Sequence, residues 1–430
     1  PRIAKILGKK ASPDKFYRLS CYSVSCDSGN DLILHSTLSG MTVLLSEKDK
    51  ALINDGEPIR GADIIDNNIT ELVSDCFLIE KETDEYEQYR LVISVLKSLS
   101  KESKGVKSFT ILPTTGCNAR CVYCYEQGMA VRTMSRETAD RTADFIDRTR
   151  WKDPVKLIWF GSEPLVGSNI ISHICGRLIE KNIEFTSSIV MNATLFTPES
   201  VDEAVSCWHL RSAQVSVDGK REDYEDRKRY YNPSINNYDR AMEAIGYLLD
   251  RGVKVTLRCN YDSGNSDGLK TFFEDVKRRF GDTDNLNVYM AMLFQAKEHE
   301  SCVDLYRETQ SYIEDIGIKH SDDSHNSGKL KLNYCMADSD GKCVVIDPAG
   351  ELYNCEHLPT NTSFGSIYDP DVTVNSDARA KLPANDICKT CSFLPTCTPF
   401  FRNGCPDHFK YCREFKRIKF DKMLRRIVTK

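Results

Sequence analysis

Between residues 106 and 316, short apolar runs alternate with longer segments whose apolar residues recur every three or four positions. Short apolar runs bounded by turns indicate buried strands, and the three-to-four spacing indicates amphipathic helices. The expected strands cover 108–113, 155–160, 185–191, 213–217, 253–259 and 287–293. The expected helices cover 135–149, 170–181, a segment that begins at Thr197-Pro198, 238–251, 269–280 and 303–316. Six strand–helix pairs predict an α/β fold, a partial (β/α)6 barrel with ligands at the carboxyl ends of its strands.

The first hundred residues follow a different pattern. Short alternating runs at 17–25 and 31–46 predict strands, and 46–54 predicts a helix. Residues 69–81 predict a short helix and a strand, and 86–100 an amphipathic helix. We therefore expect a small α+β module before the barrel.

A polar segment at 319–329 lacks large apolar residues and predicts a loop between domains. The organisation we expect is an N-terminal module (1–105), the partial barrel (106–318) and a C-terminal domain (330–430). A chain of 430 residues suits two or three domains.

The charge balance limits the partners. The net charge is −5 and the sequence pI is about 6.0, which argues against a protein that coats nucleic acid. No apolar run reaches transmembrane length and no signal peptide opens the chain, so we expect no membrane partner and a cytoplasmic location.

Eighteen cysteines in such a chain favour metal binding over a disulfide framework. Cys117, Cys121 and Cys124 share one loop with C-x3-C-x2-C spacing, directly after the first barrel strand. Three thiolates leave one iron of a four-iron cluster open to a small molecule. Zinc would usually require a fourth ligand nearby, and none follows in this loop.

Eight more cysteines crowd the C-terminal region, where eight thiolates would complete two four-iron clusters. They are Cys335, Cys343, Cys355, Cys388, Cys391, Cys397, Cys405 and Cys412. A turn at 348–350 predicts a hairpin across 344–355, with Cys343 and Cys355 at its ends. The other seven cysteines are scattered, with no ligand-like spacing beyond the pair Cys21 and Cys26, and we interpret them as small buried apolar residues.

The cysteine loop resembles the signature of the radical S-adenosylmethionine (SAM) enzymes. The resemblance implies a [4Fe–4S] cluster whose open iron binds SAM. Reductive cleavage of SAM would yield a 5′-deoxyadenosyl radical that abstracts hydrogen. Tyr123 matches the position of the aromatic residue that lies by the adenine.

Residues at later strand ends carry the same resemblance. Gly161-Ser162-Glu163-Pro164 resembles the Gly-Gly-Glu-Pro motif that holds the SAM amino group, with Ser162 in place of the second glycine. Further positions that match SAM contacts are Asn192, Ser216 and Arg227. The segment SVDG (216–219) resembles the family's strand-end Asp-Gly, and Asn260, which ends the fifth strand, is a further candidate. An alternative for Arg227 is membership of a solvated charge run with Arg221 and Arg229.

The C-terminal cysteines resemble a SPASM domain, which carries two auxiliary [4Fe–4S] clusters. The spacing after Cys397 is x7, where the family usually has x3. Two structural zinc sites are the alternative. By this resemblance the two ligand sets are Cys335, Cys343, Cys355 and Cys405, and Cys388, Cys391, Cys397 and Cys412.

Together these resemblances imply a radical SAM/SPASM peptide maturase. It would crosslink a ribosomally made precursor peptide, with a thioether favoured and a carbon–carbon link next. The N-terminal module resembles leader-binding domains that add a peptide to a sheet edge. The alternative is a capping domain with no ligand of its own. A reductase such as flavodoxin or ferredoxin would be a partner.

Two other functions stay open. An anaerobic sulfatase maturase forms formylglycine and uses an Asp after a SPASM cysteine as base. Here Glu356 follows Cys355 and is the candidate catalytic base. A multi-cluster electron-transfer protein is the alternative outside the enzymes.

Overall fold

The structure is a computed structural model of the chain. It describes residues 2–7, 9–54, 57–99, 105–152, 154–293, 299–320, 330–332, 336, 339, 341–358, 362–374, 386–397, 414, 417–418, 420–421 and 423–424. Contacts between Cα atoms divide the chain into two compact units. The module unit comprises 1–102, 323–335 and 381–430, and the barrel unit comprises 103–322 and 336–380.

A parallel sheet forms the centre of the barrel unit. In the described part of the chain, six parallel strands follow the spatial order β12-β11-β10-β9-β8-β7. The predicted α/β partial barrel is therefore confirmed. The strands are β7 (Ser108–Ile111), β8 (Val155–Trp159), β9 (Phe185–Met191), β10 (Leu210–Ser216), β11 (Lys254–Tyr261) and β12 (Leu286–Met292).

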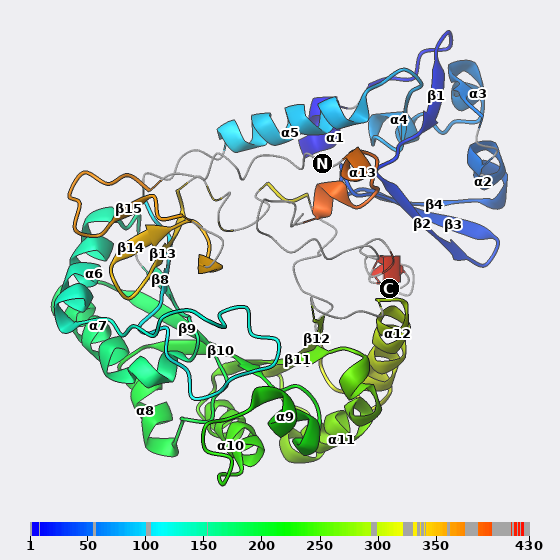
Figure 1. Ribbon diagram of the computed structural model, residues 1–430. Coiled ribbons are helices and arrows are strands. Elements are labelled where there is room, and N and C mark those ends of the chain that lie inside the picture. Colours follow the sequence, from blue (N-terminus) through cyan, green and yellow to red (C-terminus); the bar gives the residue numbers. More distant parts are fainter. Residues whose placement is uncertain are drawn as a thin grey trace. The chain divides into compact units, whose positions relative to one another are not determined.

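Helices line one side of this curved sheet (Figure 1). Local chemistry fixes where they begin: the Ser135 side chain accepts the Thr138 N–H, and Thr197 forms a capping box with Ser200. Their apolar faces contribute buried side chains such as Ile174 and Phe272 to the core. The helices are α6 (Arg136–Thr149), α7 (Ser168–Glu180), α8 (Pro198–Ser206), α10 (Asn237–Asp250), α11 (Leu269–Phe280) and α12 (His299–Asp315).

One helix of the barrel unit was not predicted. α9 (Arg221–Lys228) occupies the charged segment after β10. Its sequence, REDYEDRK, has no apolar periodicity from which a helix could be predicted. The side chains that it buries are those of Tyr224, Arg227 and Lys228, and two of these are charged. Arg227 is 8% exposed, so its interpretation as part of a solvated charge run was wrong.

The predicted C-terminal hairpin is present and extends the barrel sheet. β13 (Cys343–Ile346) pairs in parallel with β7, and β14 (Glu351–Tyr353) pairs antiparallel with β13. β15 (Gly365–Ser366) follows at the edge. Cys343 begins β13 and Cys355 follows β14, as expected.

The module unit contains two three-stranded antiparallel sheets in its described residues. The expected strand at 17–25 is two strands in different sheets, because the chain turns at residues 20–22. One sheet has the order β5 (Ile59–Arg60), β1 (Phe16–Leu19), β6 (Leu78–Glu80). The other has the order β2 (Ser23–Ser28), β3 (Asp31–Ser36), β4 (Thr42–Leu45). The helices are α1 (Arg2–Leu7), α2 (Glu47–Asn54), α3 (Gly61–Asp66), α4 (Glu71–Ser74) and α5 (Glu85–Leu99).

C-terminal segments complete this unit. α13 (Asp386–Lys389) and the 3-10 turn η6 (Leu394–Thr396) follow one another closely, and Leu394 packs into a core with Tyr22 and Tyr89. The region 330–430 therefore contributes to both compact units, while its interpretation as one functional domain stays a prediction.

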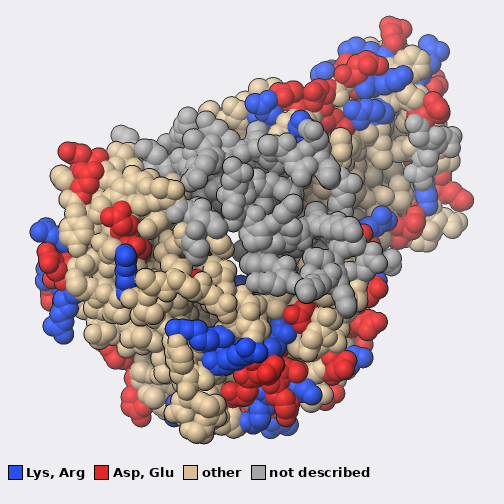
Figure 2. Space-filling model, viewed as in Figure 1, with Lys and Arg blue, Asp and Glu red and all other residues tan. Residues whose placement is uncertain are grey.

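Charged side chains of both signs intermingle on the visible face of the barrel unit (Figure 2). None of the helices in the described residues has the length and apolar character needed to cross a membrane.

Candidate active site

The loop that carries Cys117, Cys121 and Cys124 follows β7 and is held in place by backbone hydrogen bonds. All three thiols are half-buried. The N–H groups of Arg120 and Val122 donate to the carbonyls of Lys228 (3.0 Å) and Arg227 (2.9 Å). The end of α9, which the sequence did not predict, therefore fixes the part of the loop around Cys121.

The donor chemistry of this loop suits an iron–sulfur cluster, since its three side chains are soft sulfur ligands. The Ala119 N–H donates to Cys117 Sγ at 3.4 Å, a contact that favours a thiolate. Without a metal, burial raises the pKa of the Cys117 thiol to about 12, so metal binding must displace a proton. Among the described residues, no three His, Cys, Asp or Glu side chains are gathered closely enough for a single metal ion. A four-iron cluster has a different requirement, because its own volume keeps the ligand sulfurs apart.

Glycine is required at the start of the 161–164 motif. Gly161 has φ +113°, and a Cβ there would lie 2.7 Å from the Thr114 carbonyl oxygen. The motif therefore passes tightly against the strand end that leads into the cysteine loop. Pro164 follows as the first residue of η1 (Pro164–Gly167).

Glu163 joins two strand ends. Its carboxylate is completely buried and accepts the N–H groups of Asn192 (2.7 Å) and Leu165 (3.3 Å). Burial raises the pKa of Glu163 to about 7, while these two N–H groups oppose the rise. Each of the two carboxylate oxygens therefore accepts a hydrogen bond from a backbone N–H of the protein.

Ser162, which departs from the family pattern, has a partner that the sequence did not reveal. Its hydroxyl lies 2.6 Å from Glu126 Oε2 and 3.0 Å from the Thr115 carbonyl oxygen. Glu126 is 9% exposed, and burial raises the pKa of its carboxyl. Glu126 stands two residues after Cys124, which is the one signal that could have identified it.

Asn192 fastens the end of β9 to the cysteine loop. Its Nδ2 donates to Asn118 Oδ1 at 2.8 Å, and its Oδ1 accepts the Thr194 N–H at 3.0 Å. The next residue, Ala193, has φ +67°, which explains why the family pattern has glycine at this position.

A buried polar network surrounds Tyr123. The Tyr123 hydroxyl donates to the Asp218 carboxylate, and Asn260 Nδ2 donates to Asp218 Oδ1 at 2.9 Å. Lys228 Nζ lies 3.5 Å from Asp218 Oδ2 and 5.6 Å from the centroid of the Tyr123 ring. Burial raises the pKa of Tyr123, so this phenol stays protonated.

Lys228, like Glu126, is a site residue that the sequence interpretation missed, whereas Asp218 belongs to the strand-end Asp-Gly that it noted. Asp218 is fully buried and Lys228 is 3% exposed. Burial is the largest single influence and lowers the pKa of Lys228, but the acidic groups around it, Asp218 first among them, together raise that pKa above its ordinary value. Asp218 lies two residues after the end of β10, and the following Gly219 completes the Asp-Gly pair that the resemblance indicated.

The remaining predicted SAM contacts differ in their surroundings. Arg227 Nη1 lies 2.9 Å from Asp262 Oδ1, and its guanidinium carbon lies 5.6 Å from the Tyr123 ring centroid. Ser216 ends β10 and is half-buried. Arg227 thus lies beside Tyr123, while its charge is balanced by Asp262.

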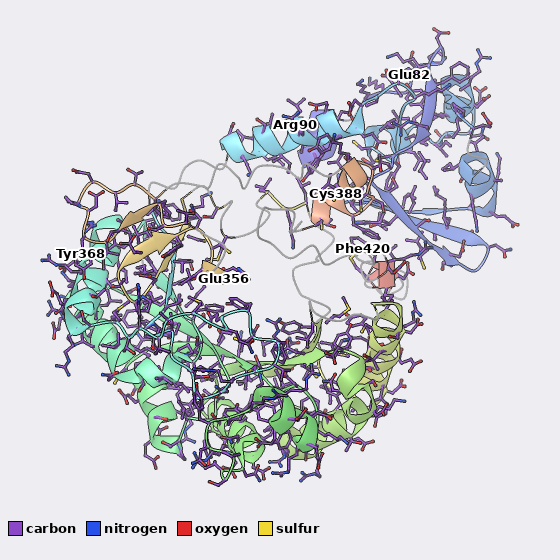
Figure 3. All side chains as sticks on the ribbon, viewed as in Figure 1. Glu82, Arg90, Glu356, Tyr368, Cys388 and Phe420 are labelled. Carbon is purple, nitrogen blue, oxygen red and sulfur yellow. The ribbon has the colours of Figure 1, made fainter. Side chains whose placement is uncertain are left out.

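The end of the C-terminal hairpin lies against the cysteine loop. The Tyr125 ring stacks on His357, with centroids 4.5 Å apart and planes 17° apart. Burial is the main cause of a raised pKa of Tyr125, and the nearby Glu356 and Cys355 raise it further. Figure 3 labels Glu356 close to the hairpin, and its Oε2 is buried without a hydrogen bond in the described structure.

The predicted cluster ligands after the hairpin belong to the module unit or lie outside the described residues. Cys388, Cys391 and Cys397 are half-buried in the module unit, with Cys388 on α13 (Figure 3). Three of the predicted ligands, Cys335, Cys405 and Cys412, lie outside the described residues.

Residues 111–276 match the Radical SAM superfamily. An uncharacterized protein of Methanocaldococcus jannaschii is 22% identical over 267 residues, which are 62% of this chain and 90% of that protein.

Two solved structures share the fold. The structure titled native anSMEcpe with bound AdoMet is 16% identical, has a TM-score of 0.58, and covers 75% of this chain and 98% of its own. SuiB of Streptococcus suis is 14% identical, has a TM-score of 0.52, and covers 94% of this chain and 99% of its own. SuiB has also been solved bound to precursor peptide SuiA, at 14% identity and a TM-score of 0.50.

Proposed function

We propose that this radical SAM enzyme crosslinks a ribosomally made precursor peptide, with a thioether as the favoured product and a carbon–carbon link as the next. The observation that carries the proposal is the meeting of the cysteine loop with buried polar side chains from four other strand ends. These side chains are Glu163, Asn192, Asp218 and Asn260. Such convergence at the carboxyl ends of parallel strands is typical of a ligand site.

The residues around the loop have distinct proposed roles. Cys117, Cys121 and Cys124 would hold a [4Fe–4S] cluster, which with SAM bound supplies the 5′-deoxyadenosyl radical. Tyr123 would lie by the adenine, positioned by Asp218 and Asn260. The other proposed SAM contacts are Gly161, Ser162, Glu163, Pro164, Asn192, Ser216 and Arg227.

Peptide as the substrate class is supported by the whole-chain likeness to SuiB, whose coverage extends over both units of this chain. The module unit offers the edge strands β2 and β4, which could add a peptide strand. An external reductase of flavodoxin or ferredoxin type would supply the electron for SAM cleavage.

A thioether crosslink balances as a two-electron oxidation of the peptide. One C–H bond and one S–H bond break, and one C–S bond forms. One hydrogen atom would leave with 5′-deoxyadenosine and one proton would leave from the thiol. An auxiliary cluster held by the C-terminal cysteines would accept the remaining electron. Glu356 is the proposed acceptor of the proton, since its Oε2 is buried without a hydrogen bond in the described structure.

The test uses the full chain, reconstituted with iron and sulfide, and a short Cys-rich peptide encoded beside its gene. We expect 5′-deoxyadenosine from SAM under dithionite, and a peptide product lighter by two hydrogen atoms whose cysteine resists alkylation. The variant with Cys117, Cys121 and Cys124 all changed to Ala should form neither product and keep the C-terminal iron. SAM cleavage at the wild-type rate in that variant would refute the cluster assignment.

Glu356 also favours a second candidate, formylglycine formation of the anaerobic sulfatase maturase type. The product mass separates the two, because formylglycine formation removes the sulfur of the cysteine. A protein that holds iron but releases no 5′-deoxyadenosine would instead be an electron carrier.

A further inference from the structure

Cys21 lies in the turn between β1 and β2 and was expected to be a small buried apolar residue. In the structure its thiol is half-buried. It packs against the same core as Cys388 and Cys391, which come from the far end of the chain. That core includes Tyr22, Tyr89 and Leu394.

Two hydrogen bonds fasten the C-terminal cysteine turn to this place. The Tyr22 hydroxyl donates to the Lys389 carbonyl at 2.9 Å, and the Thr37 hydroxyl donates to the Ser392 carbonyl at 2.5 Å. The two carbonyls stand directly after Cys388 and Cys391. The thiols of Cys21 and Cys391 are also within electrostatic range of each other.

The C-terminal segment gathers three thiols in a few residues. Backbone N–H groups of Cys391 and Leu394 donate to the carbonyls of Cys388 (3.1 Å) and Cys391 (2.9 Å). The Cys397 N–H donates to the Leu394 carbonyl at 3.1 Å. Consecutive tight turns therefore hold Cys388, Cys391 and Cys397 in one compact segment beside Cys21.

The backbone of Cys21 is held in place by hydrogen bonds to a buried carboxylate. Its backbone N–H lies 3.0 and 3.1 Å from the two oxygens of the buried Glu85 carboxylate. Arg18 Nη1 lies 2.5 Å from Glu85 Oε1, so the carboxylate is paired with a cation. This arrangement fixes the backbone of Cys21 in the turn before β2.

We propose that Cys21 is a ligand of the cluster held by Cys388, Cys391 and Cys397, in the place that the family resemblance gives to Cys412. The proposal rests on the proposed auxiliary clusters. Four sulfur donors from two segments match the ligand set of a [4Fe–4S] cluster. The cluster would then tie the start of the chain to its C-terminal segment within the module unit.

The test measures iron in the full-length chain whose Cys117, Cys121 and Cys124 are changed to Ala, so that only auxiliary iron remains. We expect about eight irons per chain before further substitution. Cys21→Ser should lower the content to about four, or shift the electron paramagnetic resonance spectrum of the reduced protein by exchanging a sulfur ligand for oxygen. Cys26→Ser, in β2 of the same unit, should change neither.

Cys388→Ala separates this inference from its premise. Full iron in both Cys388→Ala and Cys21→Ser would mean that the auxiliary clusters themselves are wrong. Iron loss in Cys388→Ala with full iron and an unchanged spectrum in Cys21→Ser would overturn the role of Cys21 alone. A measurement on the wild type avoids the problem of a variant that fails to fold. In the iron-loaded wild type, Cys21 should resist alkylation by iodoacetamide, and it should react after the iron is chelated. Equal labelling before and after chelation would refute the proposal.

Discussion

Glu163 shows how burial sets the chemistry of a single side chain. Two backbone N–H groups hold its carboxylate at the ends of β8 and β9. Burial nevertheless raises its pKa to about 7, from 4.5 in the unfolded chain. The folded protein therefore binds this proton more tightly than the unfolded chain does.

The expected consequence is a loss of stability as pH rises. Protonated Glu163 contributes fully to stability below pH 4.5, and this contribution is lost as pH rises through the folded pKa of about 7. Glu163→Gln cannot titrate, so wild type should lose about 3 kcal/mol relative to the variant between pH 5 and 8. Urea unfolding of both proteins, without iron, at several pH values measures this difference. A difference that is independent of pH would contradict the prediction.

At the scale of elements, α9 connects the barrel to the cysteine loop through the carbonyls of its last two residues. Its C-cap, Arg229, is exposed and has φ +50° and ψ 66°, a left-handed conformation that favours glycine. Arg229→Gly should raise the free energy of unfolding by about 0.5 to 1 kcal/mol, because it relieves this strain. Arg229→Ala keeps the Cβ and should bring no such gain. Thermal unfolding of the three proteins, followed by circular dichroism, measures the effect.

The edge strand β4 is the element that tests peptide binding. Leu44 on β4 is 52% exposed. Leu44→Asp should weaken binding of a labelled precursor peptide about tenfold, because it removes one apolar contact of roughly 1.5 kcal/mol. Ile65→Asp, on α3 and 40% exposed, is the matched control in the same unit. Fluorescence anisotropy measures both. Equal affinities would argue against strand addition at β4.

At the scale of the whole molecule, the C-terminal cysteines belong to two compact units, and the ends of the chain share one of them. Removal of residues 1–100 would strip the core against which Leu394 packs. Point variants therefore test the module more cleanly than truncation does.

Metal content is the whole-molecule prediction. Anaerobically reconstituted protein should hold about twelve irons per chain, in one SAM-binding and two auxiliary four-iron clusters. Iron and zinc analysis of the same sample measures this. About four irons with two zincs would show that the C-terminal cysteines form structural zinc sites.

The sequence by itself determined the elements that depend on local pattern. Apolar periodicity located the six barrel strands, and the spacing of Cys117, Cys121 and Cys124 identified the loop for the cluster. Gly161 was also recognisable as the first residue of the 161–164 motif, and the structure shows a positive φ and no space for a Cβ beside the Thr114 carbonyl oxygen. Each of these features depends on a few consecutive residues, and it can therefore be predicted from the local sequence.

Only the tertiary structure decided which distant residues meet. Lys228 neutralises Asp218 beneath Tyr123, although a charged segment carries no apolar periodicity that would predict a buried helix. β13 pairs with β7 across more than two hundred residues, and Cys21 and Cys388, from distant parts of the chain, pack against one core. These pairings depend on burial and charge balance in the folded state, which no short pattern encodes.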